Sequence, residues 1–320
     1  MAVLHDTVEP SDCIDSIQLS DGRWIVAIGT YLLNKSDGTR SGRIYLGIGD
    51  LFDATDYTAV DGVFDLRFYR INGIIRLVVA DCLGRLTIYT MAEAPLALHK
   101  ESSVQMHEGL AFHISFDGNT FITTGSDGCV AIAALDKQTL ALERQASWKA
   151  HDYDPWCCIH SEADPNQLLT GGDDCALKVW DQRCPEVVLK SSMAHGAGVT
   201  CMTWVGGELV TGSYDGVIRI FDIRRIGYER DSISTEAGVW RCRPSPTDPS
   251  TLAVANMHAG FSKASLASMS VVSQYKAHGV GVEGAEVGLG YGVAWLGEIV
   301  GCVSFYDHTF SLWDECGQDC

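Results

Sequence analysis

The sequence of 320 residues contains few prolines and no long apolar run. Only 8 prolines are present and there is no low-complexity tract, so we expect an ordered chain. No apolar stretch reaches the roughly 18 residues of a membrane-spanning helix, and the first ten residues, MAVLHDTVEP, are too polar for a signal peptide. These absences predict a cytoplasmic protein that does not bind membranes.

Basic residues are also scarce. Lysine and arginine number 23 against 41 aspartates and glutamates, which gives a formal net charge of −18. A surface of this charge repels phosphate groups, so binding to nucleic acid or to an anionic membrane is not expected. A protein partner with a basic surface is compatible with this charge.

Several catalytic and metal-binding motifs are missing. The 12 cysteines are scattered singly apart from the neighbours Cys157 and Cys158, and no C-x-x-C pair suggests a zinc site. The nucleophile elbow G-x-S-x-G, the Walker loop, the dinucleotide fingerprint and H-E-x-x-H do not occur. We therefore predict no metal and no cofactor, and the pattern alone favours a binding scaffold over an enzyme.

A repeat of about 40 to 45 residues is the main positive signal. Strand-like segments end in Trp180-Asp181, Phe221-Asp222 and Trp313-Asp314, and weaker copies end near residues 45, 89, 136 and 266. Each of the seven units has apolar strands separated by Gly, Asp or Asn turns. This period with a Trp-Asp ending is typical of WD repeats, and it predicts an all-β fold, a seven-bladed WD-repeat β-propeller forming one domain over residues 1–320.

The start of the chain is expected to complete the last blade. Only six residues follow Asp314, too few for a full outer strand, whereas residues 2–8 precede the first repeat. An amino-terminal strand in this position would close the ring and cover two sheet edges.

Three hairpins carry an aspartate six residues before the aromatic residue that ends the repeat: Asp174, Asp215 and Asp307. The likeness to WD repeats implies that this aspartate belongs to a structural cluster with a histidine, a Ser or Thr and the aromatic residue. His151 with Asp174, and His195 with Asp215, fit that role, because buried polar groups in sheets need partners.

The residue before each such aspartate is expected on a turn at the mouth of the ring. By this alignment five blades place two carboxylates, an imidazole and two phenols around one rim: Asp127, Asp173, Tyr214, His258 and Tyr306. Polar rims of propellers commonly bind peptides, so a peptide-binding rim is the alternative to a catalytic one.

Five segments resemble the eukaryotic diphthine methylesterase family of WD-repeat proteins. They are WKAHDYDPW (148–156), GGDDCALKVWDQR (171–183), GVWR (238–241), ANMHAGF (255–261) and SFYDH (304–308), and residues 11–19 resemble the family's entry into the first blade. The likeness spans nearly the whole chain in the same order. Two positions depart from the family. Ala294 stands where its Tyr-Gly-x-Asp-Trp motif has aspartate, and Asp154 replaces the glutamate of His-x-x-Glu-x-Trp.

The resemblance implies hydrolysis of the methyl ester of methylated diphthine, a modified histidine of translation elongation factor 2. The product carboxylate would then be amidated by another, ATP-dependent enzyme. Because the substrate side chain also carries a trimethylammonium group, a rim of Asp127, Asp173, Tyr214, Trp240 and Tyr306 would suit it through carboxylate attraction and cation–π contact.

Ester hydrolysis without a serine or cysteine elbow points to an activated water and a general base. His258 is the first candidate base, with Asp173 or Asp127 to orient it, and His308 is the second, although a solvated turn histidine fits His308 equally well. His151, Asp154 and Glu236 are further substrate-binding candidates. His151 also suits the structural cluster, and Glu236 also suits an exposed, solvated position.

Two non-catalytic functions are alternatives to the esterase. The first is a scaffold that binds a protein through the same rim. The second is a substrate adaptor of a ubiquitin ligase, suggested only by the segments WDQR and FDIR. Arginine is common after such repeats, so the sequence favours this adaptor least.

Overall fold

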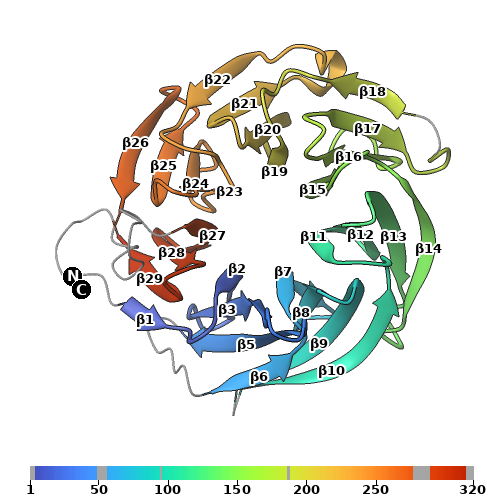
Figure 1. Ribbon diagram of the computed structural model, residues 1–320, viewed down its shortest axis with the longest axis vertical. Coiled ribbons are helices and arrows are strands. Elements are labelled where there is room, and N and C mark those ends of the chain that lie inside the picture. Colours follow the sequence, from blue (N-terminus) through green and yellow to red (C-terminus); the bar gives the residue numbers. More distant parts are fainter. Residues whose placement is uncertain (1–3, 49–55, 94–95, 186–187, 277–288, 315–320) are drawn as a thin grey trace.

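The computed structural model describes residues 4–48, 56–93, 96–185, 188–276 and 289–314. Within these ranges seven antiparallel sheets stand around one axis (Figure 1). The predicted seven-bladed, all-β propeller is confirmed. We number the sheets as blades one to seven in chain order, beginning at residue 11.

The first three blades cover residues 11 to 149. Blade one contains β2 (Ser11–Gln18), β3 (Trp24–Thr30), β4 (Leu32–Leu33), β5 (Arg40–Ile48) and β6 (Tyr57–Val60). Blade two contains β7 (Val63–Ile71), β8 (Ile74–Asp81), β9 (Arg85–Glu93) and β10 (Leu96–Gln105). Blade three contains β11 (Ala111–Asp117), β12 (Thr120–Gly125), β13 (Cys129–Leu135) and β14 (Leu142–Lys149).

The next three blades follow the same plan. Blade four contains β15 (Cys157–His160), β16 (Gln167–Gly171), β17 (Leu177–Asp181) and β18 (Val188–Ser192). Blade five contains β19 (Val199–Val205), β20 (Glu208–Ser213), β21 (Val217–Phe221) and β22 (Asp231–Ser234), with the short 3-10 helix η1 (Ile223–Arg225) after β21. Blade six contains β23 (Arg241–Pro244), β24 (Thr251–Ala255), β25 (Phe261–Ser265) and β26 (Ser270–Tyr275).

Blade seven combines both ends of the chain. Its strands β27 (Gly290–Leu296), β28 (Ile299–Ser304) and β29 (Thr309–Trp313) pair in order, and β1 (Leu4–Asp6) adds the outer strand. Leu4 pairs with Ser311 and Asp6 with Thr309, and the Thr7 backbone N–H donates to the His308 carbonyl at 2.8 Å. The predicted closure of the ring by the amino-terminal strand is confirmed.

The core lies between neighbouring blades. Ile25 and Ala27 of blade one, for example, pack with Val63, Leu66 and Leu77 of blade two, all of them fully buried. Such residues recur along the inner strands because both faces of these strands are covered by adjacent sheets. The apolar faces of each sheet therefore depend on the sheets on either side.

The innermost strands all run in the same direction along the axis. Where they begin, the rings of Phe112 (β11) and Trp156 (just before β15) lie 4.6 Å apart; where they end, Ser115 Oγ lies 3.2 Å from His160 Nδ1. The first residues of neighbouring inner strands therefore lie together, and so do the last residues. We call the end of the ring where the inner strands begin the upper end, and the opposite end the lower end.

Deleting residues 1–9 should lower the melting temperature by roughly 5–10 °C, because it removes the outer strand of blade seven and the buried side of the Glu9–Arg43 ion pair. The measurement is a thermal unfolding curve by circular dichroism. Thr7→Val, which removes only the hydroxyl contacts to the Glu9 and His308 carbonyls and to Ser11 Oγ, should give a smaller loss. An unchanged curve for the deletion would show that the strand does not close the ring.

Candidate functional site

Aromatic side chains form a connected layer at the upper end. From Tyr31 to Phe305, consecutive ring centroids lie 4.6 to 5.3 Å apart except for one step of 5.6 Å. The aromatic layer consists of Tyr31, Phe64, Phe112, Trp156, Trp240, Tyr291 and Phe305, with Tyr214 packed on Trp240 at 5.6 Å. Most of these rings are only half-buried, so the layer presents ring surface to solvent.

The layer follows from the register of the inner strands. Phe64 and Phe112 occupy the bulge near the start of β7 and β11, and Trp240 and Tyr291 lie at the start of β23 and β27. Blade five has the small Thr200 in its bulge, and this hydroxyl donates to the Val239 carbonyl. The two indoles of Trp156 and Trp240 can therefore meet across blade five at 5.3 Å.

Three carboxyl groups adjoin the aromatic layer. Asp173 accepts a hydrogen bond from Trp156 Nε1 at 2.6 Å, and its backbone N–H donates to the Asp154 carbonyl at 2.9 Å. Partial desolvation raises the pKa of Asp154 and of Asp173, and the charge of Asp173 raises that of Asp154 further. Rings and carboxylates in this arrangement attract a cation.

The third carboxyl belongs to Asp12, which sequence reasoning missed. It occupies the bulge of β2 that corresponds to Phe64 in β7, and it is 4% exposed. Burial raises its pKa to about 8, although the charge of Arg241 opposes the rise. Asp12 acts in turn on Tyr214 and Tyr291, whose pKa values it raises together with burial. Its sequence signal is weak, because Asp15 follows three residues later in the same strand, SDCIDSIQ (11–18), and no local feature distinguishes the two.

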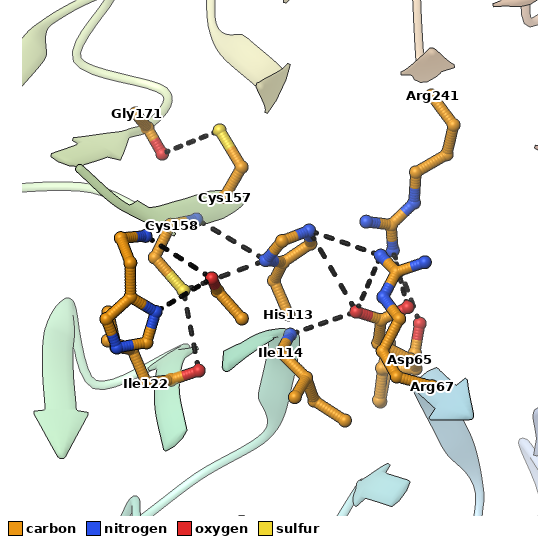
Figure 2. Close-up of polar contacts among 12 residues, drawn as sticks. Asp65, Arg67, His113, Ile114, Ile122, Cys157, Cys158, Gly171 and Arg241 are labelled. Carbon is orange, nitrogen blue, oxygen red and sulfur yellow. Dashed lines mark hydrogen bonds and ion pairs between the residues drawn. The ribbon is translucent and has the colours of Figure 1, made fainter. Parts of the chain in front are cut away.

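Below the aromatic layer a buried ion group lies on the axis (Figure 2). Asp65 Oδ2 lies 3.1 Å from Arg67 Nη2 and accepts the Ile114 backbone N–H at 2.9 Å, and Asp65 Oδ1 lies 3.8 Å from Arg241 Nη2. His113 lies beside this pair; burial lowers its pKa to about 3, so its ring is neutral. Side chains from blades two, three and six are thereby held together.

The structural cluster predicted for blade four is confirmed. His151 Nδ1 lies 2.7 Å from Asp174 Oδ1, and His151 Nε2 and Trp180 Nε1 reach Thr170 Oγ1 at 2.7 and 2.8 Å. His151 is 1% exposed and both ring nitrogens are occupied. The alternative assignment of His151 to substrate binding is wrong, because the side chain does not reach the upper surface.

Blade five forms the cluster only in part. His195 Nε2 contacts Thr211 Oγ1 at 2.8 Å, but Asp215 pairs with Arg219 at 2.8 Å and accepts the Gly196 backbone N–H. The predicted His195–Asp215 bond does not form, since the carboxylate is already held by these two donors. Asp307 of blade seven accepts the backbone N–H of Thr309, as Asp215 does from Val217.

Asp127 is a structural aspartate and not a rim residue. Thr124 pairs with Val130 as Gly171 pairs with Leu177, so Asp127 corresponds to Asp174 and not to Asp173. Its carboxylate lies 3.1 Å from His107 Nδ1. The sequence alignment of this blade was one residue out of register, and the substrate-binding role that rested on it is corrected.

The same slip affects His258. Ala255 pairs with Phe261, which makes Met257 the counterpart of Asp173 and places His258 one residue further along the turn. Met257 packs beside Tyr214 and Tyr291, whereas His258 is exposed. The structure therefore does not bring His258 and Asp173 together as a catalytic pair.

The remaining candidates take different positions. Tyr306 is 58% exposed and its ring meets that of Phe305 edge-on at 5.3 Å. His308, with φ of 55°, is half-buried on the same turn. Glu236 is exposed and pairs with Lys276 at 2.6 Å, which is the solvated position left open as its alternative.

Ala294 lies away from the aromatic layer. It is 3% exposed and packs with Ile14, Val26 and Val303 in the apolar cluster between blades seven and one. Three residues earlier on the same strand, Tyr291 belongs to the layer. The departure from the family motif at Ala294 therefore changes the core between two blades and leaves the upper end intact.

A family model described as WD domain, G-beta repeat, matches residues 142–181 and 187–222. The first matched range runs from β14, the outer strand of blade three, to the end of β17 in blade four. The repeat in the sequence is thus offset by one strand from the blade in the structure. Each repeat contributes a strand to two neighbouring blades.

Proteins of known name resemble the chain over most of its length. A diphthine methyltransferase homolog of Dictyostelium discoideum is 26% identical over 79% of this chain and 76% of its own. The diphthine methyltransferases of Schizosaccharomyces pombe (29%, covering 68% of each chain) and Saccharomyces cerevisiae (22%, covering 90% and 92%) are similar as well. The resemblance inferred from the sequence is confirmed by these relatives.

A chain in a structure titled "Crystal Structure of Mitotic Checkpoint Complex" superposes with a TM-score of 0.72 over 98% of this chain and 90% of that chain. At 16% identity the likeness concerns the fold alone. Within the described ranges, no helix has the length and apolar character needed to cross a bilayer. The described residues also contain no group of three or more His, Cys, Asp or Glu arranged to hold a metal ion.

Asp127→Ala should destabilise the fold by about 2 kcal/mol at pH 7. Burial alone would raise the pKa of Asp127, but the His107 hydrogen bond outweighs it and lowers the pKa from 3.8 to about 2. A depressed carboxyl pKa stabilises the fold above the unfolded value and loses that effect as the pH falls toward about 2. Urea unfolding at pH 7 and pH 3 should show the larger loss at pH 7.

The matched control is Glu143→Gln, an exposed carboxylate on the outer strand of the same blade. It should change the free energy of unfolding by less than about 0.5 kcal/mol. Equal stability of Asp127→Ala and the control would contradict the structural role.

Proposed function

We propose that this protein acts in diphthamide biosynthesis and hydrolyses the methyl ester of methylated diphthine on translation elongation factor 2. The similarity to proteins named diphthine methyltransferase supports a role with this modified residue. The observation that carries the proposal is the aromatic layer with three carboxyl groups at one end of the ring, because the substrate side chain carries a trimethylammonium group.

We expect the rings and the carboxylates to bind different features of the trimethylammonium group. A quaternary ammonium makes no hydrogen bonds, so its binding depends on ring faces and nearby negative charge. Trp240, Tyr214 and Trp156 supply the faces, and Asp173, fixed by its hydrogen bond from Trp156, supplies charge. Asp154 adds a second carboxylate behind Asp173.

For the chemistry, we assign the general base to Asp12. A buried carboxyl with a pKa of about 8 is suited to accept a proton near neutral pH, as buried catalytic acids and bases are. In the proposed step Asp12 takes a proton from water, and the oxygen of that water bonds to the ester carbonyl carbon. Collapse of the tetrahedral intermediate breaks the bond to methoxide, which takes the proton back and leaves as methanol, with the carboxylic acid as the other product.

Two buried donors next to Asp12 are suited to the oxyanion. Among the described residues, Trp240 Nε1 and Arg241 Nη1 have no hydrogen-bond partner although both atoms are buried. Unpaired buried donors are costly, by about 1–3 kcal/mol each, unless a ligand or water supplies the acceptor. Donors arranged in advance for a developing negative charge commonly supply a large part of catalysis.

The histidines chosen from the sequence fit this site less well. His258 is exposed one residue beyond the inward-facing Met257, and His308 lies on the turn next to the closing strand. We retain His258 as the alternative base and His308 as a second one, to be compared directly with Asp12. Asp173 is assigned to cation binding in preference to orientation of a histidine.

The alternative function is a non-catalytic scaffold that binds a protein through the upper end. The exposed rings of Tyr153 and Tyr306, at 67% and 58% exposure, favour a protein contact at this surface. Such contacts would also serve the esterase, since its substrate side chain belongs to a protein. Turnover therefore separates the two functions, and binding does not.

Incubation with elongation factor 2 that carries methylated diphthine should release methanol and remove the mass of one methyl ester from the modified histidine. Asp12→Asn should lower kcat/KM at least 100-fold, in line with roughly 10²–10⁴ for a lost general base. In the wild type, kcat/KM should rise with pH and level off above about 8, because only ionised Asp12 accepts a proton.

His258→Ala is assayed in parallel, and Glu143→Gln serves as the exposed-carboxylate control. Full turnover by Asp12→Asn together with loss in His258→Ala would move the base to His258. Saturable binding without methanol would favour the scaffold, and a gain of methyl groups from a methyl donor would reverse the proposed direction.

Asp173→Asn should raise KM about fivefold for the trimethylammonium substrate, the size expected for loss of one charge beside a cation. Asparagine keeps the shape and can still accept from Trp156 Nε1. A substrate peptide with a neutral tert-butyl group in place of trimethylammonium should show no such change. An equal rise in KM for both substrates would mean that Asp173 supports the loop and does not bind the cation.

A further inference from the structure

A cavity lies at the lower end, opposite the aromatic layer. Its volume is about 420 Å³, within the range of roughly 300–1,000 Å³ that small-molecule sites occupy. It lies where the inner strands β7, β11, β15, β19 and β23 run toward their ends, and the loop of Ser161 and Glu162 forms part of its wall. Arg67 and His113 of the buried ion group form one side of it, so this group lies between the lower cavity and the aromatic layer.

Two buried nitrogen atoms of residues that line this cavity lack partners among the described residues. They are Arg67 Nη1 and His160 Nε2. Arg67 is 6% exposed, and its other terminal nitrogen, Nη2, contacts Asp65 and His113. No buried side-chain oxygen of a described lining residue is left without a partner. Arg67 Nη1 is a donor that lacks an acceptor, and His160 Nε2 is another in the tautomer assigned below.

We assign to His160 the tautomer that carries its proton at Nε2, which the contact of Nδ1 with the Ser115 hydroxyl allows. Ser115 Oγ accepts the His160 backbone N–H at 3.3 Å, which leaves the serine hydroxyl free to donate to His160 Nδ1 at 3.2 Å. Burial lowers the pKa of His160 to about 4, so the ring is neutral at pH 7. A neutral ring that accepts at Nδ1 carries its proton at Nε2, and Nε2 is then a donor.

The arginines of the cavity lie deeper than its carboxylates. Arg67 lies deep and shares Asp65 with Arg241, while Arg243 adds a second guanidinium to the lining. The carboxylates of the lining, Asp117 and Glu162, are both exposed, as expected for residues at the mouth of the cavity. The guanidiniums of Arg67, Arg241 and Arg243 outnumber the two buried carboxyl groups beside Arg67, those of Asp65 and Asp15. Net positive charge inside and negative charge at the mouth suit a small anion and disfavour a large polyanion.

We propose that the lower cavity binds a small oxyanion, a carboxylate or a phosphate, through Arg67 Nη1, His160 Nε2 and the guanidinium of Arg243. The oxygen atoms of the anion would supply the acceptors that the buried donors lack. The site is separate from the proposed esterase chemistry, which uses the upper end, and it requires no turnover.

Isothermal titration calorimetry of the full chain at pH 7.5 and constant chloride tests the site with two probes, inorganic phosphate and succinate. We expect saturable binding of at least one probe. His160→Leu and Arg243→Gln should each weaken it at least tenfold, and Arg144→Gln, which removes an exposed arginine on the outer strand of blade three, should change it less than twofold. Arg67 is left intact because its loss would leave Asp65 poorly paired.

Binding of phosphate alone or of succinate alone supports the site and identifies the class of oxyanion. Absence of saturable heat with both probes would overturn the proposal, as would equal weakening by Arg243→Gln and Arg144→Gln. Asp173→Asn at the upper end should bind the probe like the wild type, and a tenfold loss there would place the anion at the wrong end. The readout is the heat of binding, so failure here is independent of the esterase assay.

Discussion

Closure of the ring is the constraint on which the other features of this protein depend. Each blade leaves apolar faces that only its neighbours cover, so the ring is stable only when the last sheet meets the first. The strand Leu4–Asp6 pairs with β29 and brings both chain ends into blade seven. Closure also places the inner strands of blades one and seven side by side (Figure 1), and with them Asp12 and Tyr291.

The fold could be predicted from the sequence because its signals are local. The endings Trp180-Asp181, Phe221-Asp222 and Trp313-Asp314 mark strand ends by themselves, and residues 2–8 precede the first repeat, where they are available as the closing strand. The cluster around His151 was predictable for the same reason. All of its members come from one repeat at fixed spacing.

The candidate site was less accessible to sequence reasoning. Blades three and six lack the ending aromatic, so their turns were aligned one residue out of register, and Asp127 and His258 were placed on the rim in error. Asp12 and Arg241 are 229 residues apart (241 − 12) and come together only through the closed ring. No local sequence pattern predicts such a contact, and the raised pKa of Asp12 comes mainly from its burial in the closed ring.

The two ends of the ring differ in chemistry because the inner strands change character along their length. Their beginnings carry aromatic rings with acidic neighbours, and the residues toward their ends include Arg67, His160 and Arg243. Between these zones the group of Asp65, Arg67, His113 and Arg241 is almost fully buried. The charge of Asp65 and those of the two arginines offset part of one another's cost of burial, and His113 lies beside them as a neutral ring.

The buried ion group of Asp65, Arg67, His113 and Arg241 separates the upper end of the ring from the lower end. Its side chains lie between the aromatic rings and the lower cavity, which Arg67 and His113 line, so we expect whatever is formed among the rings to leave by the way it entered. For a side chain attached to a large protein this means that each round of chemistry ends with the two proteins separating. Dissociation of the partner protein, and not diffusion along a tunnel, would then limit the rate of product release from the upper end.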